Sequence, residues 1–200
     1  MIPNGVDRPN VQEATLITET FGLTKDAYIL FLGRLVPEKG IRYLIEAFQQ
    51  VKTNKKLVIA GGSSDTDSFM QTLKEMAKED DRMLFTGFVQ GQMLQELYSN
   101  AYLYTLPSDL EGMPLSLLEA MSYGNCCLVS DIPECADVVE DKALIFKKSN
   151  VDDLKEKLQD ACDHPEKVNH YQKQAADFIC QKYHWDAIVA ETLKLYRGEM

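Results

Sequence analysis

Short, unbroken apolar runs recur along the chain, and most of them end at a glycine, a proline or a polar turn. Such runs are typical of strands that are buried on both faces of a parallel sheet. None of them approaches the ~20 apolar residues that a membrane-spanning helix needs. The pattern predicts six strands, at residues 28–33, 57–62, 83–88, 101–107, 126–131 and 143–146.

Between these runs, apolar residues recur with the spacing of amphipathic helices. This spacing predicts helices over 41–51, 69–77 and 92–100, from residue 114 onward, and through most of the chain after residue 150. Strands and helices alternate without a linker or an internal repeat. The alternation predicts one α/β domain over residues 1–200: a Rossmann-like, doubly wound parallel sheet of about six strands, with helices on both faces and further C-terminal helices.

Polar and glycine-containing loops follow four of the predicted strands, at residues 33–40, 61–67, 87–91 and 107–114. Parallel strands have their carboxyl ends at the same edge of a sheet. Ligands of such sheets bind outside that edge, near the point where the strand order reverses. We therefore expect these four loops to form one ligand-binding surface, which we call the rim.

The most informative stretch is PSDLEGMPLSLLEAMSYG, at residues 107–124, which places Glu111 and Glu119 eight positions apart. Pro114 suits the first turn of a helix, so Glu111 is expected on the preceding loop and Glu119 inside the helix. The N-terminus of that helix offers free N–H groups and the positive end of a dipole to an anion. Carboxylates beside an anion site indicate a ligand that carries both phosphates and hydroxyls, such as a sugar nucleotide.

Other interpretations of the two glutamates are weaker. An acid and base pair of a glycoside hydrolase is disfavoured, because a helix N-terminus lowers the pKa of a nearby carboxyl group instead of raising it for acid duty. Glu119 could also be an ordinary solvated helix residue. Its neighbours Leu118, Ala120 and Met121 are apolar, however, so we expect its carboxylate to have a partner.

Arg34 and Lys39 follow the first predicted strand directly and are the clearest cationic pair on the rim. A guanidinium can bind a phosphate with two hydrogen bonds, while a lysine supplies a movable point charge. The alternative is that both are solvated surface cations. Their position beside the predicted helix start at 112–115 favours a phosphate site.

Charge and cysteine content restrict the class of ligand. The formal net charge is −10, of which residues 1–100 contribute −2 and residues 101–200 contribute −8. This balance disfavours a nucleic acid partner, which needs a basic face.

The five cysteines have no regular spacing and no secretory signal accompanies them, so we expect reduced thiols in a cytosolic protein. A metal site built from Cys126, Cys127, Cys135 and a histidine is disfavoured, because Cys126 and Cys127 are adjacent in a predicted buried strand and their side chains point to opposite faces.

Two further patterns imitate known motifs. Asp65 and Asp67 form a D-x-D sequence, but they stand where a helix is expected to begin, so capping explains them better than a metal does. Gly61 and Gly62 follow a strand, yet the G-x-G-x-x-G pattern of dinucleotide-binding proteins is missing. We therefore expect neither a metal ion nor another cofactor.

The combined motifs resemble the C-terminal, donor-binding half of a family 4 glycosyltransferase of the GT-B fold. Either the E-x7-E element of Glu111 and Glu119 or the loop of Arg34 and Lys39 would be a moderate signal by itself, and together they are strong. The matching segments are IPNGVD at 2–7, GRLVPEKG at 33–40, LVIAGG at 57–62, FTGFV at 85–89, PSDLEGMPLSLLEAM at 107–121, SDIPECADVV at 130–139 and HWDAIVAETLKLY at 184–196.

The resemblance implies a role for each matching residue. Arg34 and Lys39 would bind the donor diphosphate beside Gly33, and Glu119 would accept hydrogen bonds from the ribose. Glu111 and the backbone of the next four residues would hold the sugar and phosphates, with Arg34, Lys39 and Glu111 the catalytic group. The remaining donor contacts would come from Phe88 and Val89 near the base and from Gly112, Met113, Pro114 and Leu115.

The resemblance also implies what surrounds this domain. Such enzymes are retaining, metal-independent hexosyltransferases that use nucleoside diphosphate sugars, UDP-sugars among them, and bind the acceptor in an N-terminal domain that this chain lacks. We expect the chain to be inactive alone and to need that domain or a partner subunit, with the last helix exposing an apolar patch. A cytoplasmic location, with peripheral contact at the inner membrane in the full enzyme, is expected. A non-catalytic nucleotide-sugar-binding subunit and part of a sugar-nucleotide epimerase are the alternatives.

Overall fold

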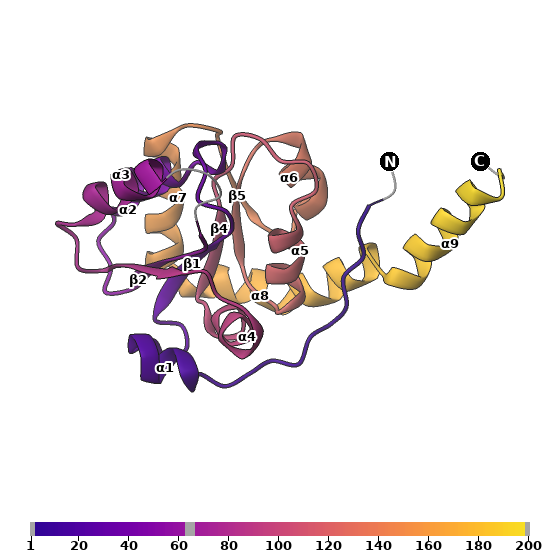
Figure 1. The fold of residues 1–200 in the computed structure, drawn as a ribbon, viewed down its shortest axis with the longest axis horizontal. Coiled ribbons are helices and arrows are strands. Elements are labelled where there is room, and N and C mark those ends of the chain that lie inside the picture. Colours follow the sequence, from indigo (N-terminus) through magenta and orange to yellow (C-terminus); the bar gives the residue numbers. More distant parts are fainter. Residues whose placement is uncertain (1–2, 63–66, 199–200) are drawn as a thin grey trace.

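A computed structural model describes residues 3–62 and 67–198, in which six parallel strands form one sheet with the order β3-β2-β1-β4-β5-β6 (Figure 1). This confirms the predicted Rossmann-like class, and each strand lies within or next to its predicted run. The strands are β1 (Tyr28–Leu32), β2 (Lys56–Ala60), β3 (Met83–Gly87), β4 (Leu103–Leu106), β5 (Cys127–Ser130) and β6 (Leu144–Phe146).

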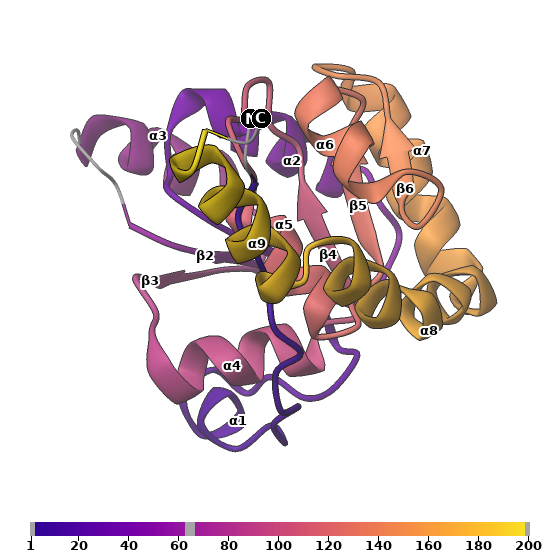
Figure 2. The same cartoon turned by 90° about the vertical axis from the view of Figure 1, so that its right-hand side faces the viewer.

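Helices cover both faces of this sheet. Around β1, β2 and β3, helices α2 and α3 lie on one face and α1 and α4 on the other (Figure 2). Helix α7 packs on α2, and α8 packs on α5. Their bounds are α1 (Leu16–Phe21), the 3-10 turn η1 (Pro37–Lys39), α2 (Ile41–Phe48), α3 (Asp67–Ala77), α4 (Gly91–Asn100), α5 (Leu115–Ser122), α6 (Pro133–Val139), α7 (Val151–Asp163), α8 (Pro165–Lys182) and α9 (Trp185–Tyr196).

The centre of the sheet is the most deeply buried part of the molecule. In β1, Ile29 and Leu30 are fully buried and pair with β2 on one side and β4 on the other. Burying one such side chain contributes about 1.5–3 kcal/mol, which explains why a short apolar run suffices to specify this strand. The chain winds outward from β1 through β2 to β3, and then returns to β4 on the other side of β1. The strand order therefore reverses between β1 and β4.

Helix α1 was not predicted from the sequence, because a buried carboxylate from another element organises it. Glu96 of α4 is fully buried and accepts hydrogen bonds from the Thr15 N–H at 2.9 Å, the Thr15 hydroxyl at 2.7 Å and the Ile17 N–H at 3.1 Å. Gln92 donates a fourth bond at 2.8 Å. These contacts satisfy N–H groups at the start of a six-residue helix whose own side chains do not cap it.

The same contacts set the protonation of Glu96 and predict an acid-sensitive contribution to stability. Burial raises the pKa of Glu96, but the donors from Thr15, Ile17 and Gln92 outweigh it and lower the pKa from 4.5 to about 2. A lowered pKa in the folded state stabilises the fold above pH 4.5. This contribution is lost as the pH falls from 4.5 through 2.

We expect Glu96→Gln to lower the free energy of unfolding at pH 7 by about 2–4 kcal/mol, because an amide cannot accept all four bonds. The difference from the unmodified chain should shrink as the pH falls below 4.5, and urea denaturation across that range measures it. Glu19→Gln, an exposed change on α1, is the matched control. A loss of stability in Glu96→Gln that stays constant with pH would contradict the assigned protonation.

The last helix, α9, extends away from the body of the domain (Figure 1). Several of its large apolar side chains are exposed, Tyr196 to 85% and Leu195 to 54%, as the sequence predicted. At its base the ring of Trp185 lies against Gly5, and the Val6 N–H donates to the Tyr183 carbonyl at 2.9 Å. Over the described residues, the model contains no helix that is both long and apolar enough to cross a membrane.

Candidate functional site

The loops after β1 and β4 meet in backbone contact at the point where the strand order reverses. Gly40 has a φ of +65°, and a Cβ atom there would lie 2.0 Å from the Pro107 carbonyl oxygen. Close by, the Asp109 N–H donates to the Glu38 carbonyl at 2.8 Å. A glycine is required because the two backbones leave no room for a side chain. This contact brings the two sequence motifs, 33–40 and 107–114, into one surface.

A second backbone contact joins the loops after β1 and β2. Gly61 has a φ of +145°, and its Cβ would lie 1.8 Å from the Gly33 carbonyl oxygen. The Leu35 N–H also donates to the Gly62 carbonyl at 3.0 Å. The Gly61 N–H donates in turn to the Gly87 carbonyl at 2.9 Å, at the start of the loop after β3. The predicted rim therefore brings together all four loops, as far as the structure describes them.

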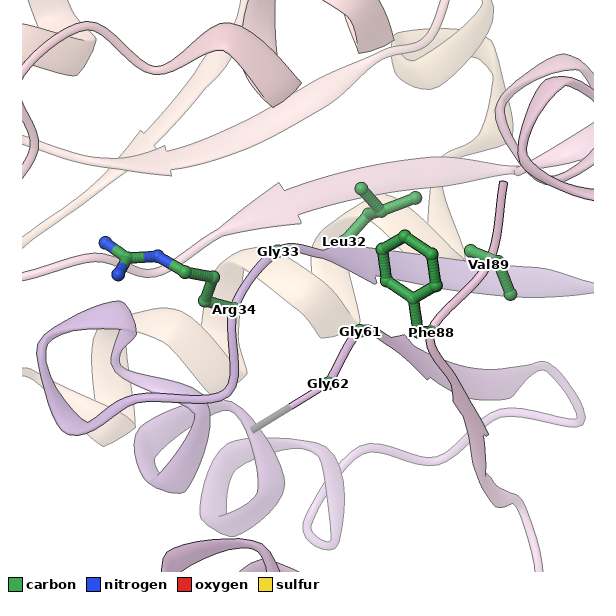
Figure 3. Close-up of a pocket in the computed structure, with 7 residues that line it drawn as sticks. All are labelled: Leu32, Gly33, Arg34, Gly61, Gly62, Phe88 and Val89. Carbon is green, nitrogen blue, oxygen red and sulfur yellow. The ribbon is translucent and has the colours of Figure 1, made fainter. Parts of the chain in front are cut away.

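A cavity of about 370 Å³ opens beside the loop after β1 (Figure 3). Phe88 forms one wall with 75% of its surface exposed, and Arg34 extends on the opposite side of the glycines from the Phe88 ring. The residues that line the cavity are Leu32, Gly33, Arg34, Gly61, Gly62, Phe88 and Val89. Gly61 and Gly62 were missed as site residues because their sequence showed only a tight turn. The apolar walls suit a flat, uncharged ring, and Arg34 suits an anion attached to it.

Lys39 and Glu111 form an ion pair across the two loops, which the sequence did not predict. The Lys39 Nζ lies 2.6 Å from Glu111 Oε1 and 2.8 Å from Oε2. Their side chains are 16% and 6% exposed. The Ser108 hydroxyl also donates to Glu111 Oε1, at 2.6 Å. Lys39 therefore reaches the rim as part of a charge-compensated pair, whereas the guanidinium of the exposed Arg34 has no hydrogen-bond or ion-pair partner among the described residues.

Helix α5 begins at Leu115, one residue after the buried Pro114. In the part of the chain that the structure describes, the N–H groups of Gly112 and Met113 have no hydrogen-bond acceptor. Gly112 is exposed and Met113 is half-buried, and both follow Glu111 directly in the chain. Of the predicted backbone donors from Gly112 to Leu115, these two remain available to an anion. The Leu115 N–H instead donates to the Met113 carbonyl at 2.9 Å.

Glu119 lies apart from Arg34 and from the cavity of Figure 3. Glu119 is exposed, and its carboxylate accepts a hydrogen bond from the Tyr98 hydroxyl at 3.0 Å. Tyr98 is therefore the partner that the sequence predicted for this carboxylate. Glu119 lines a second cavity of about 300 Å³ together with Leu115, Leu118, Trp185 and residues 4–7. The predicted residues therefore occupy three separate places: the cavity beside Arg34, the Lys39–Glu111 pair and the Glu119 cavity.

The cysteines contribute packing rather than reactive thiols. Cys126, Cys127 and Cys135 are fully buried, and burial raises the pKa of Cys126 and of Cys135 to about 12. Over the described residues, no group of three or more His, Cys, Asp or Glu side chains gathers in an arrangement that could hold a metal ion. Of the D-x-D sequence, Asp65 lies outside the described residues, and Asp67 begins α3 without a described side chain.

Taken together, the strand order and the glycine contacts define a Rossmann-like α/β domain whose polar loops meet at the reversal point of the sheet. Residues 15–178 match the family of glycosyl transferases group 1, and the chain belongs to that family. It is 33% identical over 180 residues to the glycosyltransferase MJ1607 of Methanocaldococcus jannaschii, which aligns 86% of this chain with 45% of that protein. It is 28% identical over 144 residues to the O-antigen chain mannosyltransferase B of Escherichia coli, aligning 70% of this chain with 38% of that one.

Solved structures share the fold. HepE of Anabaena, crystallised with UDP and glucose, superimposes with a TM-score of 0.81 at 19% identity, over 89% of this chain and 51% of that one. The sucrose-phosphate synthase of Thermosynechococcus elongatus superimposes with a TM-score of 0.82 at 24% identity, over 98% of this chain and 51% of that one. The chain has the fold of one Rossmann-like half of a GT-B enzyme, and it spans about half the length of the proteins it matches.

Proposed function

We propose that residues 1–200 are the donor-binding half of a retaining, metal-independent hexosyltransferase that uses a nucleoside diphosphate sugar. The observation that carries the proposal is the placement of Arg34, the Lys39–Glu111 pair and the unpaired N–H groups of Gly112 and Met113 around the reversal point. Membership of the group 1 family and the UDP-bound HepE structure support it. The acceptor-binding half would belong to another part of the protein or to a partner subunit.

In this proposal, the rim stabilises the diphosphate as it leaves. Breaking the bond between the sugar and the diphosphate increases the negative charge on the terminal phosphate. Arg34 can donate two parallel hydrogen bonds to it, and the N–H groups before α5 add neutral donors. Donors aimed at a growing charge bind the transition state more strongly than the ground state. Because the unpaired guanidinium of Arg34 supplies positive charge and Lys39 keeps a charged N–H donor, the proposal needs no metal ion.

The remaining parts of the donor fit the other predicted site residues. The apolar cavity with Phe88 and Val89 would receive the base, since a flat ring can stack on an exposed aromatic side chain. Glu119, oriented by Tyr98, would accept hydrogen bonds from the ribose hydroxyls. Glu111 would accept a hydrogen bond from the sugar, since two ionised oxygens offer about four acceptor positions and three are used here.

Isothermal titration of the chain with UDP, GDP and their glucose and mannose derivatives tests the proposal. We expect saturable binding of either the uridine or the guanosine nucleotides. Sugar transfer should occur only after an acceptor-binding half is supplied. Binding without transfer in any combination would instead favour a non-catalytic nucleotide-sugar-binding subunit. Release of UDP with an epimerised sugar in the absence of an acceptor would identify an epimerase. A chain that binds none of these nucleotides would contradict the proposal.

A further inference from the structure

The ion pair of Lys39 and Glu111 is an unexpected component of a site for a diphosphate. A carboxylate at 2.6 and 2.8 Å neutralises the lysine that would attract the phosphates. Both side chains are mostly buried, at 16% and 6% exposure, so water screens the carboxylate less than it would on an open surface. Phosphate attraction by itself does not explain why a negative charge stands here.

Hydrogen bonds of neighbouring residues hold Glu111 in this position. Ser108 is fully buried, and its hydroxyl donates to Glu111 Oε1 at 2.6 Å while its carbonyl accepts from the Ser130 hydroxyl at 2.5 Å. The neighbouring Asp109 accepts from the Tyr43 hydroxyl at 3.1 Å and from the Ser149 hydroxyl at 2.6 Å. These four hydrogen bonds anchor the loop. The Glu111 carboxylate cannot swing away from an incoming phosphate without losing its bonds to Ser108 and Lys39.

A fixed carboxylate affects the donor and the product of the proposed reaction differently. In a nucleoside diphosphate sugar, the terminal phosphate carries one ionised oxygen, because it is linked to the sugar by an ester and to the other phosphate by an anhydride. In the free nucleoside diphosphate only the anhydride remains, and a second ionisation with a pKa of about 6 is largely complete at pH 7.5. The product therefore brings almost one more negative charge to the same place.

We propose that Glu111, paired with Lys39 and positioned by Ser108, makes the site discriminate against the free nucleoside diphosphate and in favour of the sugar-bearing one. Lys39 retains a third N–H for a phosphate oxygen, while the carboxylate repels the additional charge of the product. The pair thereby assists product release. This inference rests on the proposed function, since it concerns the same site.

The test is titration calorimetry of the 200-residue chain with UDP and UDP-glucose, or with GDP and GDP-mannose if the chain binds guanine nucleotides. Glu111→Gln keeps the size of the side chain and an oxygen that can accept from Ser108. We expect it to bind UDP about 3–10-fold more tightly, because water only weakly screens the repulsion from a mostly buried carboxylate. The ratio of the UDP Kd to the UDP-glucose Kd should fall. Loss of a sugar contact alone would weaken UDP-glucose and leave UDP unchanged, which would overturn the inference.

Glu38→Gln is the matched control, because it removes the same charge from an exposed residue that neighbours Lys39. We expect it to change UDP affinity less than twofold. Ser108→Ala keeps the charge of Glu111 but removes the hydrogen bond that positions its side chain. It should tighten UDP binding by a smaller factor than Glu111→Gln. Equal UDP affinity in Glu111→Gln and Glu38→Gln, or weaker binding in Glu111→Gln, would overturn the inference. If the unmodified chain binds no nucleotide at all, the proposed function fails first, so the two failures are distinguishable.

Discussion

Replacing Arg34 with alanine should lower kcat by about 10²–10³-fold once the chain is combined with an acceptor-binding half, the range seen when one donor to a developing charge is removed. Arg34 is exposed at the lip of the cavity, and its guanidinium has no other partner among the described residues. Its loss should therefore leave the fold intact and affect the transition state directly. Steady-state rates of sugar transfer by the unmodified chain and by Arg34→Ala test this prediction. Thermal denaturation of the same two proteins checks that the fold is intact.

Arg42→Ala is the matched control, because Arg42 is an exposed cation on the neighbouring helix α2 and its removal changes the net charge equally. We expect less than a twofold effect on kcat from that change. Lys39→Ala should also reduce turnover about 10²–10³-fold, although it leaves Glu111 without its cation and so should destabilise the rim as well. Near-normal turnover in both Arg34→Ala and Lys39→Ala would show that neither side chain assists the leaving group.

The largest loss of stability is expected from Gly61→Ala. The new Cβ would lie 1.8 Å from the Gly33 carbonyl oxygen, and the φ of +145° is unfavourable for any residue with a side chain. Because backbone lies on both sides, the clash requires the loops after β1 and β2 to separate. We expect a decrease of about 3–5 kcal/mol in the free energy of unfolding, among the largest for a single methyl group. Urea denaturation measures it.

Gly62→Ala provides the comparison at the next residue. The nearest atom to its added Cβ is the Cβ of Phe88, at 3.9 Å, which is ordinary contact. Its effect on stability should remain within about 1 kcal/mol. Similar losses from the two substitutions would contradict the role assigned to the backbone contact. If Gly61→Ala still folds at low temperature, its nucleotide affinity should also fall, because the displaced loop carries Arg34.

The sequence predicted the strands of this fold but missed some of its helices. The strands were predictable because apolar runs such as 28–33 can be buried only between layers of helices. Helix α1 was not, because its first turn depends on Glu96, which lies 81 positions from Thr15. The start of α5 was predicted to within one residue, since proline restricts where a helix can begin.

For the site, the sequence determined which residue types stand at the carboxyl ends of the strands. Arg34, Lys39 and Glu111 were identifiable, because parallel strands place the loops that carry them at one edge. The tertiary structure alone decided how these residues share their charges. Lys39 and Glu111 are 72 positions apart, and their pairing depends on the backbone contact between Gly40 and Pro107. Local patterns cannot encode such a contact, because it arises only when the reversal of strand order brings β1 and β4 together.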